Sequence, residues 1–305
     1  MGKDRLGLIV TIISAASFGA MSIFAKFAYD GGANVPTVLF LRFTLAALFF
    51  WGYLSFLKRD FKPYPFAVTS KLFLLGALGY GSMSACFFLA VSRIPASLAG
   101  MLLYLYPALV TITTIVLKQE TYTRQKGLAL LITSLGLLLV LGTSFEGIDF
   151  LGILFGIGAA CTYTVYIVTG SNVLRLLEPL KATTYIITGA ASTYIIFGLT
   201  TGNLSFNFTS LAWLTISGIA LISTIVAILF FWLGVQLIGA AKASIISSIE
   251  PLITVLLAWL AFDEILSPVQ LVGGALIILG VFVLQYRGKN KEAVEPEEKL
   301  VESQG

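Results

Sequence analysis

An acidic residue and a proline stand side by side in an otherwise apolar run, the segment SSIEPLITVL. Glu250 can carry a charge or a proton. Pro251 has no backbone N–H, so the carbonyl of Ser247 loses its helical partner, and Pro107 does the same to the carbonyl of Leu103. In lipid such groups must be satisfied by protein or by a wet cavity. We therefore expect both segments to line the interior of a helical bundle.

Two cations also fall within apolar runs. Arg42 lies well inside its run and Lys26 lies near the end of another. Together with Glu250 they can form an ion pair or grip the two ends of a zwitterion. The alternative for all three is a structural pair, or side chains that reach back to the membrane interface. Because the chain has no histidine, Glu250 is also the leading candidate for carrying a coupling proton.

Aromatic residues at corresponding depth complete the candidate site. They are Tyr80, Tyr104, Tyr106, Tyr163, Tyr166 and Trp232. The alternative interpretation for each is packing or an interfacial aromatic belt. The expected substrate-binding residues are Arg42, Glu250, Tyr80, Tyr104, Tyr163 and Lys26.

Several classes of chemistry are excluded by residue types that the chain lacks. Without histidine there is no Ser-His-Asp site and no His-ligated metal. The sequence also contains neither a GxxxxGK[ST] nor a GxGxxG motif for nucleotide binding. We expect no catalytic residues, no metal and no cofactor.

The elements that must position these residues are membrane-spanning helices. Of the 305 residues 58% are hydrophobic and 11% are charged, whereas soluble domains carry about a quarter charged residues. Crossing a hydrocarbon core of about 30 Å takes roughly 20 helical residues. Ten apolar runs qualify, at residues 6–29, 35–57, 71–93, 97–117, 125–143, 150–170, 181–200, 211–237, 243–262 and 268–286. Since the alternation of a β-barrel is missing, we predict an all-α integral membrane protein with ten transmembrane helices.

Lysine and arginine indicate the orientation. With the N-terminus in the cytoplasm, sixteen of the nineteen Lys and Arg fall on that side, as the positive-inside rule requires. The basic charge is thus a topology signal and gives no reason to expect nucleic acid as a partner. Residues 287–305 are charged and lack apolar periodicity, so we expect a disordered cytoplasmic tail. Both termini are predicted to be cytoplasmic.

The chain contains an internal repeat. A shift of 144 residues brings CFFLAVSRIPASLAGMLLYLYPALV onto FFWLGVQLIGAAKASIISSIEPLIT, so that Pro107 falls on Pro251 and Glu120 on Glu264. The register stays constant over the whole chain. Carboxylates near helix N-termini are favourable, so we expect Glu120 and Glu264 to cap the helices that begin nearby and to brace their loops.

The repeat predicts two halves, residues 1–144 and 145–286, with five helices each. Because five is odd, the second half must enter the membrane from the opposite face. This is the inverted-repeat plan of many secondary transporters. Two conformations that exchange the roles of the halves are then nearly equal in energy, which allows alternating access to a central site.

The sequence resembles the EamA domains of the drug/metabolite transporter superfamily over about residues 6–286. The resemblance is carried by SFGAMSIFAKFA, FLRFTLAALFF and the paired LYPALVTITTIVLKQE and IEPLITVLLAWLAFDE. It implies a bacterial inner-membrane carrier of small metabolites, often an exporter of amino acids or related compounds, with a cavity between the halves. By position, Arg42 matches the arginine of the family's second helix and Lys26 the lysine near the end of its first. Where the family usually has Trp-Gly in the first helix, this chain has Phe18-Gly19.

We therefore predict a secondary transporter that moves a small metabolite across the bacterial inner membrane by alternating access. The resemblance implies an amino acid or related compound as the solute and export as the direction. The partners are a small-molecule solute, the lipid bilayer and, as a further candidate, protons; the oligomeric state stays open. The alternatives are an integral-membrane enzyme, and a channel without coupled carrier transport. A saturable flux with counterflow distinguishes a carrier from both.

Overall fold

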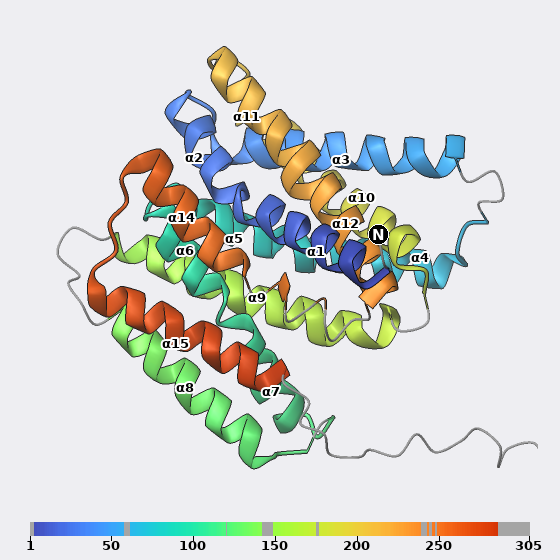
Figure 1. Cartoon of the computed structure of the whole chain (residues 1–305). Coiled ribbons are helices and arrows are strands. Elements are labelled where there is room, and N and C mark those ends of the chain that lie inside the picture. Colours follow the sequence, from blue (N-terminus) through green and yellow to red (C-terminus); the bar gives the residue numbers. More distant parts are fainter. Residues whose placement is uncertain are drawn as a thin grey trace, which may run out of the picture.

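In the computed structural model the described residues are 3–57, 62–119, 121–141, 149–174, 177–238, 243, 246–247 and 249–285. Their regular elements are all helices (Figure 1). In chain order these are α1 (Lys3–Gly19), α2 (Met21–Asp30), α3 (Val35–Leu57), α4 (Phe66–Leu74), η1 (Leu75–Tyr80), α5 (Gly81–Val91), α6 (Ala96–Leu103), α7 (Tyr106–Val116), α8 (Arg124–Leu141), α9 (Phe150–Leu174), α10 (Pro179–Thr201), α11 (Ser210–Ala220), η2 (Leu221–Val226), α12 (Ala227–Ile238), α14 (Glu250–Phe262) and α15 (Pro268–Gln285). The segments η1 and η2 are π-helical.

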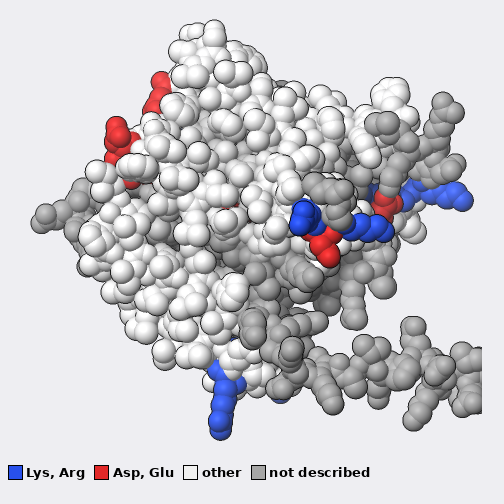
Figure 2. Space-filling view, viewed as in Figure 1, with Lys and Arg blue, Asp and Glu red and all other residues white. Residues whose placement is uncertain are grey.

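Within the described part of the chain, seven helical stretches are long and apolar enough to cross a membrane. They are Lys3–Asp30, Val35–Phe56, Phe66–Val91, Ala96–Val116, Phe150–Gly170, Pro179–Thr201 and Ser210–Ile238; Glu250–Phe262 and Pro268–Val283 are shorter apolar helices. Large apolar side chains such as Leu48, Leu138 and Leu199 lie exposed on the outside. A wide area of the face in Figure 2 carries no charged side chain. Such surfaces suit lipid tails, and the chain is a multi-pass membrane protein.

Several of these stretches are interrupted in the middle. A turn at Ala20 separates α1 from α2, and a turn at Tyr104 and Leu105 separates α6 from α7. Pro107 stands in the first turn of α7 and Pro251 in the first turn of α14. A proline there costs little because the first N–H groups of a helix have no helical partner. The two prolines therefore mark where helices begin anew inside the bundle.

The two π-helical segments are the other interruptions. η1 joins α4 to α5, and η2 joins α11 to α12. Tyr80 ends η1, and Thr224 lies within η2; these residues are 144 positions apart, as Pro107 and Pro251 are. π-Helical turns inside α-helices are rare and are frequent at functional sites.

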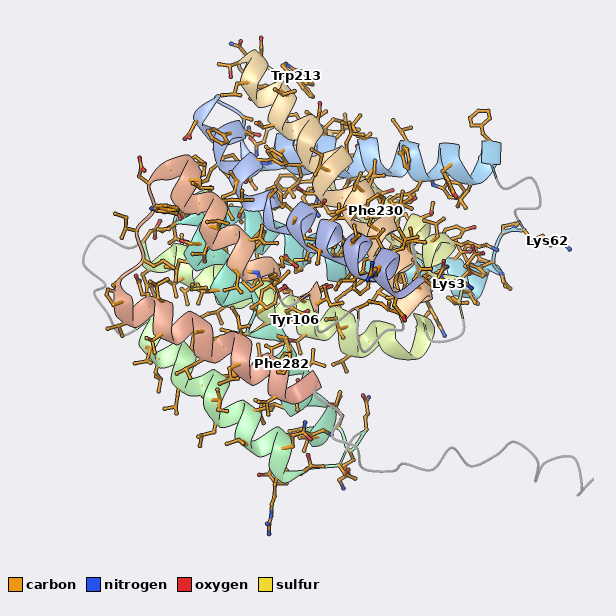
Figure 3. All side chains as sticks on the ribbon, in the orientation of Figure 1. Lys3, Lys62, Tyr106, Trp213, Phe230 and Phe282 are labelled. Atoms are coloured by element: carbon orange, nitrogen blue, oxygen red, sulfur yellow. The ribbon has the colours of Figure 1, made fainter. Side chains whose placement is uncertain are left out.

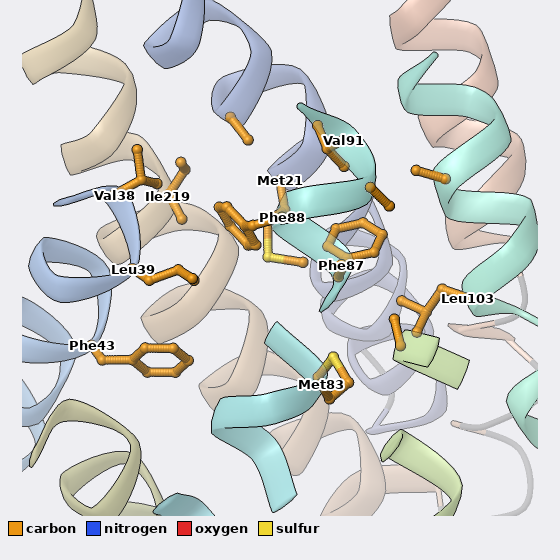
Figure 4. Packing of buried hydrophobic residues seen from close by; sticks show 14 of the residues in the cluster. Met21, Val38, Leu39, Phe43, Met83, Phe87, Phe88, Val91, Leu103 and Ile219 are labelled. Atoms are coloured by element: carbon orange, nitrogen blue, oxygen red, sulfur yellow. The ribbon is translucent and has the colours of Figure 1, made fainter. Parts of the chain in front are cut away.

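The largest buried cluster of the described residues joins α2, α3, α5 and α6 with α9, α10 and α11, and Figure 4 shows part of it. Phe43 and Phe88 are fully buried there, and the Phe43 ring stacks on Tyr194 with 5.5 Å between centroids. Lipid tails are as apolar as these side chains, so close van der Waals packing holds such helices together.

Helices α8 and α15 lie side by side (Figure 1) and meet through glycines. A Cβ on Gly136 would lie 2.6 Å from the carbonyl oxygen of Gly273, and one on Gly280 would lie 2.9 Å from that of Ala129. Gly136 and Gly280 are 144 residues apart, and so are Ala129 and Gly273. The same contact is thus made twice, with the roles of the two helices exchanged.

The connections between helices meet at two ends of the bundle. The first is called the Glu264 end, and Gly31, Asn34, Asn203 and Thr209 lie there with Glu264. The N–H of Thr209 donates to the carbonyl of Gly31 at 3.0 Å. The side chain of Asn34 donates to the carbonyl of Asn203 at 2.8 Å.

The second is called the Tyr64 end, where the N–H of Glu178 donates to the hydroxyl of Tyr64 at 3.0 Å. Lys3 and Lys62 lie on this side, across the bundle from Trp213 (Figure 3).

Candidate functional site

The middle of the bundle contains a cavity lined by both apolar and polar side chains. The space open to the centres of water-sized molecules is about 80 Å³, and a single water needs roughly 10–15 Å³ on this measure. The lining residues are Phe18, Met21, Arg42, Tyr80, Met83, Ser84, Phe87, Leu103, Tyr104, Tyr106, Tyr163 and Glu250. They include five of the expected binding residues, Arg42, Glu250, Tyr80, Tyr104 and Tyr163. The sixth, Lys26, does not line this cavity.

Arg42 is buried in the wall of the cavity, with 1% of its surface exposed. Its Nε donates to Oγ1 of Thr224 at 3.0 Å, and its Nη2 donates to the hydroxyl of Tyr80 at 3.1 Å. The guanidinium also lies over the rings of Phe43 and Phe88, 4.8 and 5.3 Å from their centroids. Among the described residues no carboxylate forms an ion pair with Arg42. Aromatic faces and hydroxyl groups thus hold this cation.

Thr224 is a residue that the interpretation of the sequence missed. Its hydroxyl donates to the carbonyl of Ile219 at 2.9 Å, so a lone pair remains to accept from Arg42. The shift of 144 residues aligns Thr224 with Tyr80. This alignment was the signal in the sequence that could have identified Thr224, because the two partners of Arg42 occupy equivalent positions in the two halves of the repeat.

Glu250 and Tyr104 both line the cavity, and their side chains are in hydrogen-bond contact. The Tyr104 hydroxyl lies 2.9 Å from Oε2 of Glu250 and 3.1 Å from the carbonyl oxygen of Ser247. This is the carbonyl that Pro251 deprives of its helical partner. The expected need for a substitute donor is therefore met by a tyrosine from the turn between α6 and α7.

Tyrosine rings form a continuous wall beside these groups. Tyr106 and Tyr163 have ring centroids 4.6 Å apart, and Tyr163 stacks on Tyr166 at 5.8 Å. Tyr80 lies 5.6 Å from Tyr166, and Tyr104 lies 6.0 Å from Tyr106. The rings connect the surroundings of Glu250 with those of Arg42.

Lys26 lies instead at the Glu264 end, where its Nζ is 2.8 Å from Oε1 of Glu264. The same carboxylate accepts from the N–H of Ala96 at 3.0 Å, from the N–H of Ser97 at 3.2 Å and from the Ser97 hydroxyl at 2.7 Å. Glu264 therefore caps a helix, as expected, but the helix is α6 rather than the one that follows it. Glu120 lies outside the described residues.

The electrostatics of Glu264 follow from these contacts. Burial alone raises the pKa of its carboxyl group. Hydrogen bonds from Lys26, from Ser97 and from the backbone of Ala96 outweigh this effect, so the pKa lies below the ordinary value of a glutamate. The ionised form is the one that the Glu264 end stabilises.

The fold and the cavity define a helical membrane protein with an internal cavity. The EamA-like transporter family model matches residues 5–142 and again residues 150–286. The chain belongs to the EamA-like transporter family, and it is a membrane transporter.

Relatives cover nearly the whole chain. It is 28% identical over 284 residues to an uncharacterized transporter of Archaeoglobus fulgidus, covering 92% of this chain and 96% of that protein. It is 25% identical over 298 residues to the uncharacterized transporter YcbK of Bacillus subtilis (strain 168), covering 92% and 93%. A solved crystal structure with 18% identity superposes with a TM-score of 0.63 over 91% of this chain and 96% of that one. This last likeness concerns the fold alone.

Proposed function

We propose that the protein is a secondary transporter that moves a small metabolite, an amino acid or related compound, across the bacterial inner membrane by alternating access. The observation that carries the proposal is the central cavity, in which Arg42 and Glu250 line one small space together with tyrosines. A buried cation, a carboxyl group and aromatic rings are suited to holding a polar solute during its passage.

The mechanism rests on ten crossings in two inverted halves, residues 1–144 and 145–286, followed by a tail at 287–305. The two family matches support this division. The reciprocal contacts of Gly136 and Gly280 support a two-fold relation between the halves, because each helix plays both roles. Closure then alternates between the Glu264 end and the Tyr64 end, while the cavity stays between them.

For the orientation we propose that the Tyr64 end faces the cytoplasm, together with both termini. The support is the excess of Lys and Arg in the segments assigned to that side. Export is the proposed direction, by analogy with the family that the sequence resembles. Labelling of single cysteines, after replacement of Cys86 and Cys161, tests the orientation. Labelling of residues 140–150 and the C-terminus from one and the same side would contradict it.

Six residues are proposed to bind the solute. Arg42, Glu250, Tyr80, Tyr104 and Tyr163 would do so in the cavity. Lys26 would act at an earlier or later stage, at the Glu264 end, when its contact with Glu264 opens.

Glu250 is also proposed to carry a coupling proton. The Tyr104 hydroxyl has one proton and two acceptors in reach, the Ser247 carbonyl and Oε2 of Glu250. If Glu250 is ionised, it competes for that proton. If Glu250 is protonated, it can donate to Tyr104, which then donates to Ser247. Protonation would thus satisfy all three groups at the break before Pro251.

The test is counterflow in proteoliposomes with a panel of candidate metabolites. We expect a saturable exchange that Arg42→Ala abolishes and that Glu250→Gln uncouples from the pH gradient. Arg124→Ala is the matched control, because Arg124 is exposed at the start of α8 and lines neither the cavity nor the pocket that Lys26 shares with Glu264. A conductive, non-saturating flux would instead indicate a channel, and turnover without vectorial movement an enzyme. If neither Arg42→Ala nor Glu250→Gln changes the exchange kinetics, then Arg42 and Glu250 do not belong to the binding site.

A further inference from the structure

The hydrogen-bond donors of Arg42 are only partly used. A guanidinium has five N–H donors arranged as a fork. Nε gives one to Thr224 and Nη2 gives one to Tyr80. The remaining three N–H groups, two on Nη1 and one on Nη2, have no hydrogen-bond partner among the described residues. The edge between Nη1 and Nη2 matches the spacing of two oxygens in a carboxylate or phosphate.

The charge of Arg42 is also uncompensated. Burial of a charge without an opposite charge is strongly unfavourable, and the described carboxylates form no ion pair with Arg42. Contacts with the rings of Phe43 and Phe88 recover only part of this cost. The arrangement is therefore unfavourable unless an anion joins it for part of the cycle.

A second donor in the cavity lacks a partner. Ser84 lines the same cavity from α5 and is 1% exposed. Its Oγ has no hydrogen-bond partner within the described part of the chain. The buried hydroxyl groups of Ser22, Thr44, Ser223 and Ser247 also lack a partner among the described residues, but of these five only that of Ser84 lines the cavity with Arg42. Buried hydroxyl groups are nearly always bonded, so its position in the cavity is a second sign of a ligand.

We propose that the Nη1–Nη2 edge of Arg42 and the hydroxyl of Ser84 bind an oxyanion group of the solute, either a carboxylate or a phosphate. This deepens the proposed function, on which it rests, by naming the chemical group that a transported solute must carry. Ser84 is thereby added to the substrate-binding residues.

Tyr80 and Thr224 act as positioning residues in this site. They occupy the Nε–Nη2 edge of the guanidinium and leave the other edge free. Because one belongs to η1 and the other to η2, the anion site is anchored to both π-helical segments.

Binding to the purified full-length protein tests the site without transport. The probes are matched pairs of carboxylates and neutral amides, acetate with acetamide and benzoate with benzamide, and methyl phosphate as the phosphate arm; the readout is thermal stabilisation over a range of concentrations. We expect the anions to stabilise the protein and the amides to do so at least about tenfold more weakly, since a charge-assisted bidentate pair is lost. Equal effects of acid and amide on the wild-type protein would overturn the proposal.

Variants locate the binding. Arg42→Lys keeps the charge but not the fork, and it should weaken anion binding about tenfold or more, whereas Arg124→Lys, at an exposed arginine at the start of α8, should not change it. Ser84→Ala should weaken anion binding about threefold, the loss of one hydrogen bond. Anion binding that survives Arg42→Lys and Ser84→Ala unchanged would contradict the assignment.

The positioning role has its own control. Thr224→Val should reduce the preference for anion over amide about threefold, and Thr224→Ser should restore it. Thr215→Val is the matched control, because the Thr215 hydroxyl bonds to carbonyls of its own helix, those of Leu211 and Ala212. If Thr224→Val leaves the preference for anion over amide intact, Thr224 does not position Arg42. This test does not require that the Arg42 variants fold.

Counterflow separates this proposal from the proposed function. If anions and neutral solutes exchange equally well, the protein is a carrier but the anion site is wrong. If anions bind through Arg42 and no solute in the panel exchanges, the site stands and the carrier function fails.

Discussion

Tyr80 and Thr224 accept hydrogen bonds from the same guanidinium, that of Arg42, although 144 residues separate them. Each lies in a π-helical segment. A single side chain from α3 thus connects two corresponding places of the repeat, at the wall of the cavity.

This relationship predicts energetic coupling between the two positions. In a double-mutant cycle Tyr80→Phe and Thr224→Val should be non-additive in the free energy of unfolding by about 0.5–3 kcal/mol, because they share one partner. Tyr80→Phe combined with Thr215→Val should be additive. The measurement is unfolding of the purified protein, and additivity in both cycles would argue against a shared guanidinium.

Glu264 should make the stability of the Glu264 end depend on pH. The pKa of Glu264 is lower in the folded protein than the ordinary value, so its contribution is fully present above the unfolded value of about 4.3. The contribution is lost as the pH falls through the folded value. Glu264→Gln should therefore lower the melting temperature at pH 7 and have a smaller effect near the folded pKa. A constant difference across this range would contradict the argument.

Tyr104→Phe should cost about 0.5–1.5 kcal/mol of stability, because it removes the hydrogen bond to the part-buried carbonyl of Ser247. Tyr53→Phe provides the control, since the Tyr53 hydroxyl makes no hydrogen bond to the described residues. Thermal unfolding compares the two variants. Equal stability would mean that another group satisfies Ser247.

Gly136→Ala and Gly280→Ala should destabilise the protein by similar amounts, about 1–3 kcal/mol each, because a Cβ at either site meets the facing backbone. At Gly52 an added Cβ would have no neighbouring atom within 4 Å, so Gly52→Ala should be neutral or slightly stabilising. Thermal unfolding again provides the comparison. Strongly unequal effects at 136 and 280 would count against equivalent contacts.

Much of this architecture follows from sequence, for reasons that differ between elements. The apolar run predicted at 35–57 coincides with α3, Val35–Leu57, because hydropathy and length alone define such a helix. The positions of Arg42 and Glu250 were predictable because charges in apolar runs must face an interior.

Other features depend on tertiary contacts that no local pattern contains. The π-helical segments have no residue signature of their own, and Ser84 and Thr224 are ordinary small polar residues of apolar helices. The partner of Lys26 was not predicted because Glu264 is 238 residues away in the chain. Glu264 was expected to cap a neighbouring helix, and only the fold brings it to α6.

The helices that begin anew inside the bundle have one more consequence. α7 starts at Tyr106 and α14 at Glu250, and both residues line the cavity. The first turn of a helix carries a partial positive charge from its aligned peptide dipoles. These two helix N-termini add a positive potential to that of the Arg42 guanidinium, and this contribution does not depend on protonation. The backbone would therefore contribute to the proposed preference for anions at every pH at which the protein is folded, whatever the protonation of Glu250.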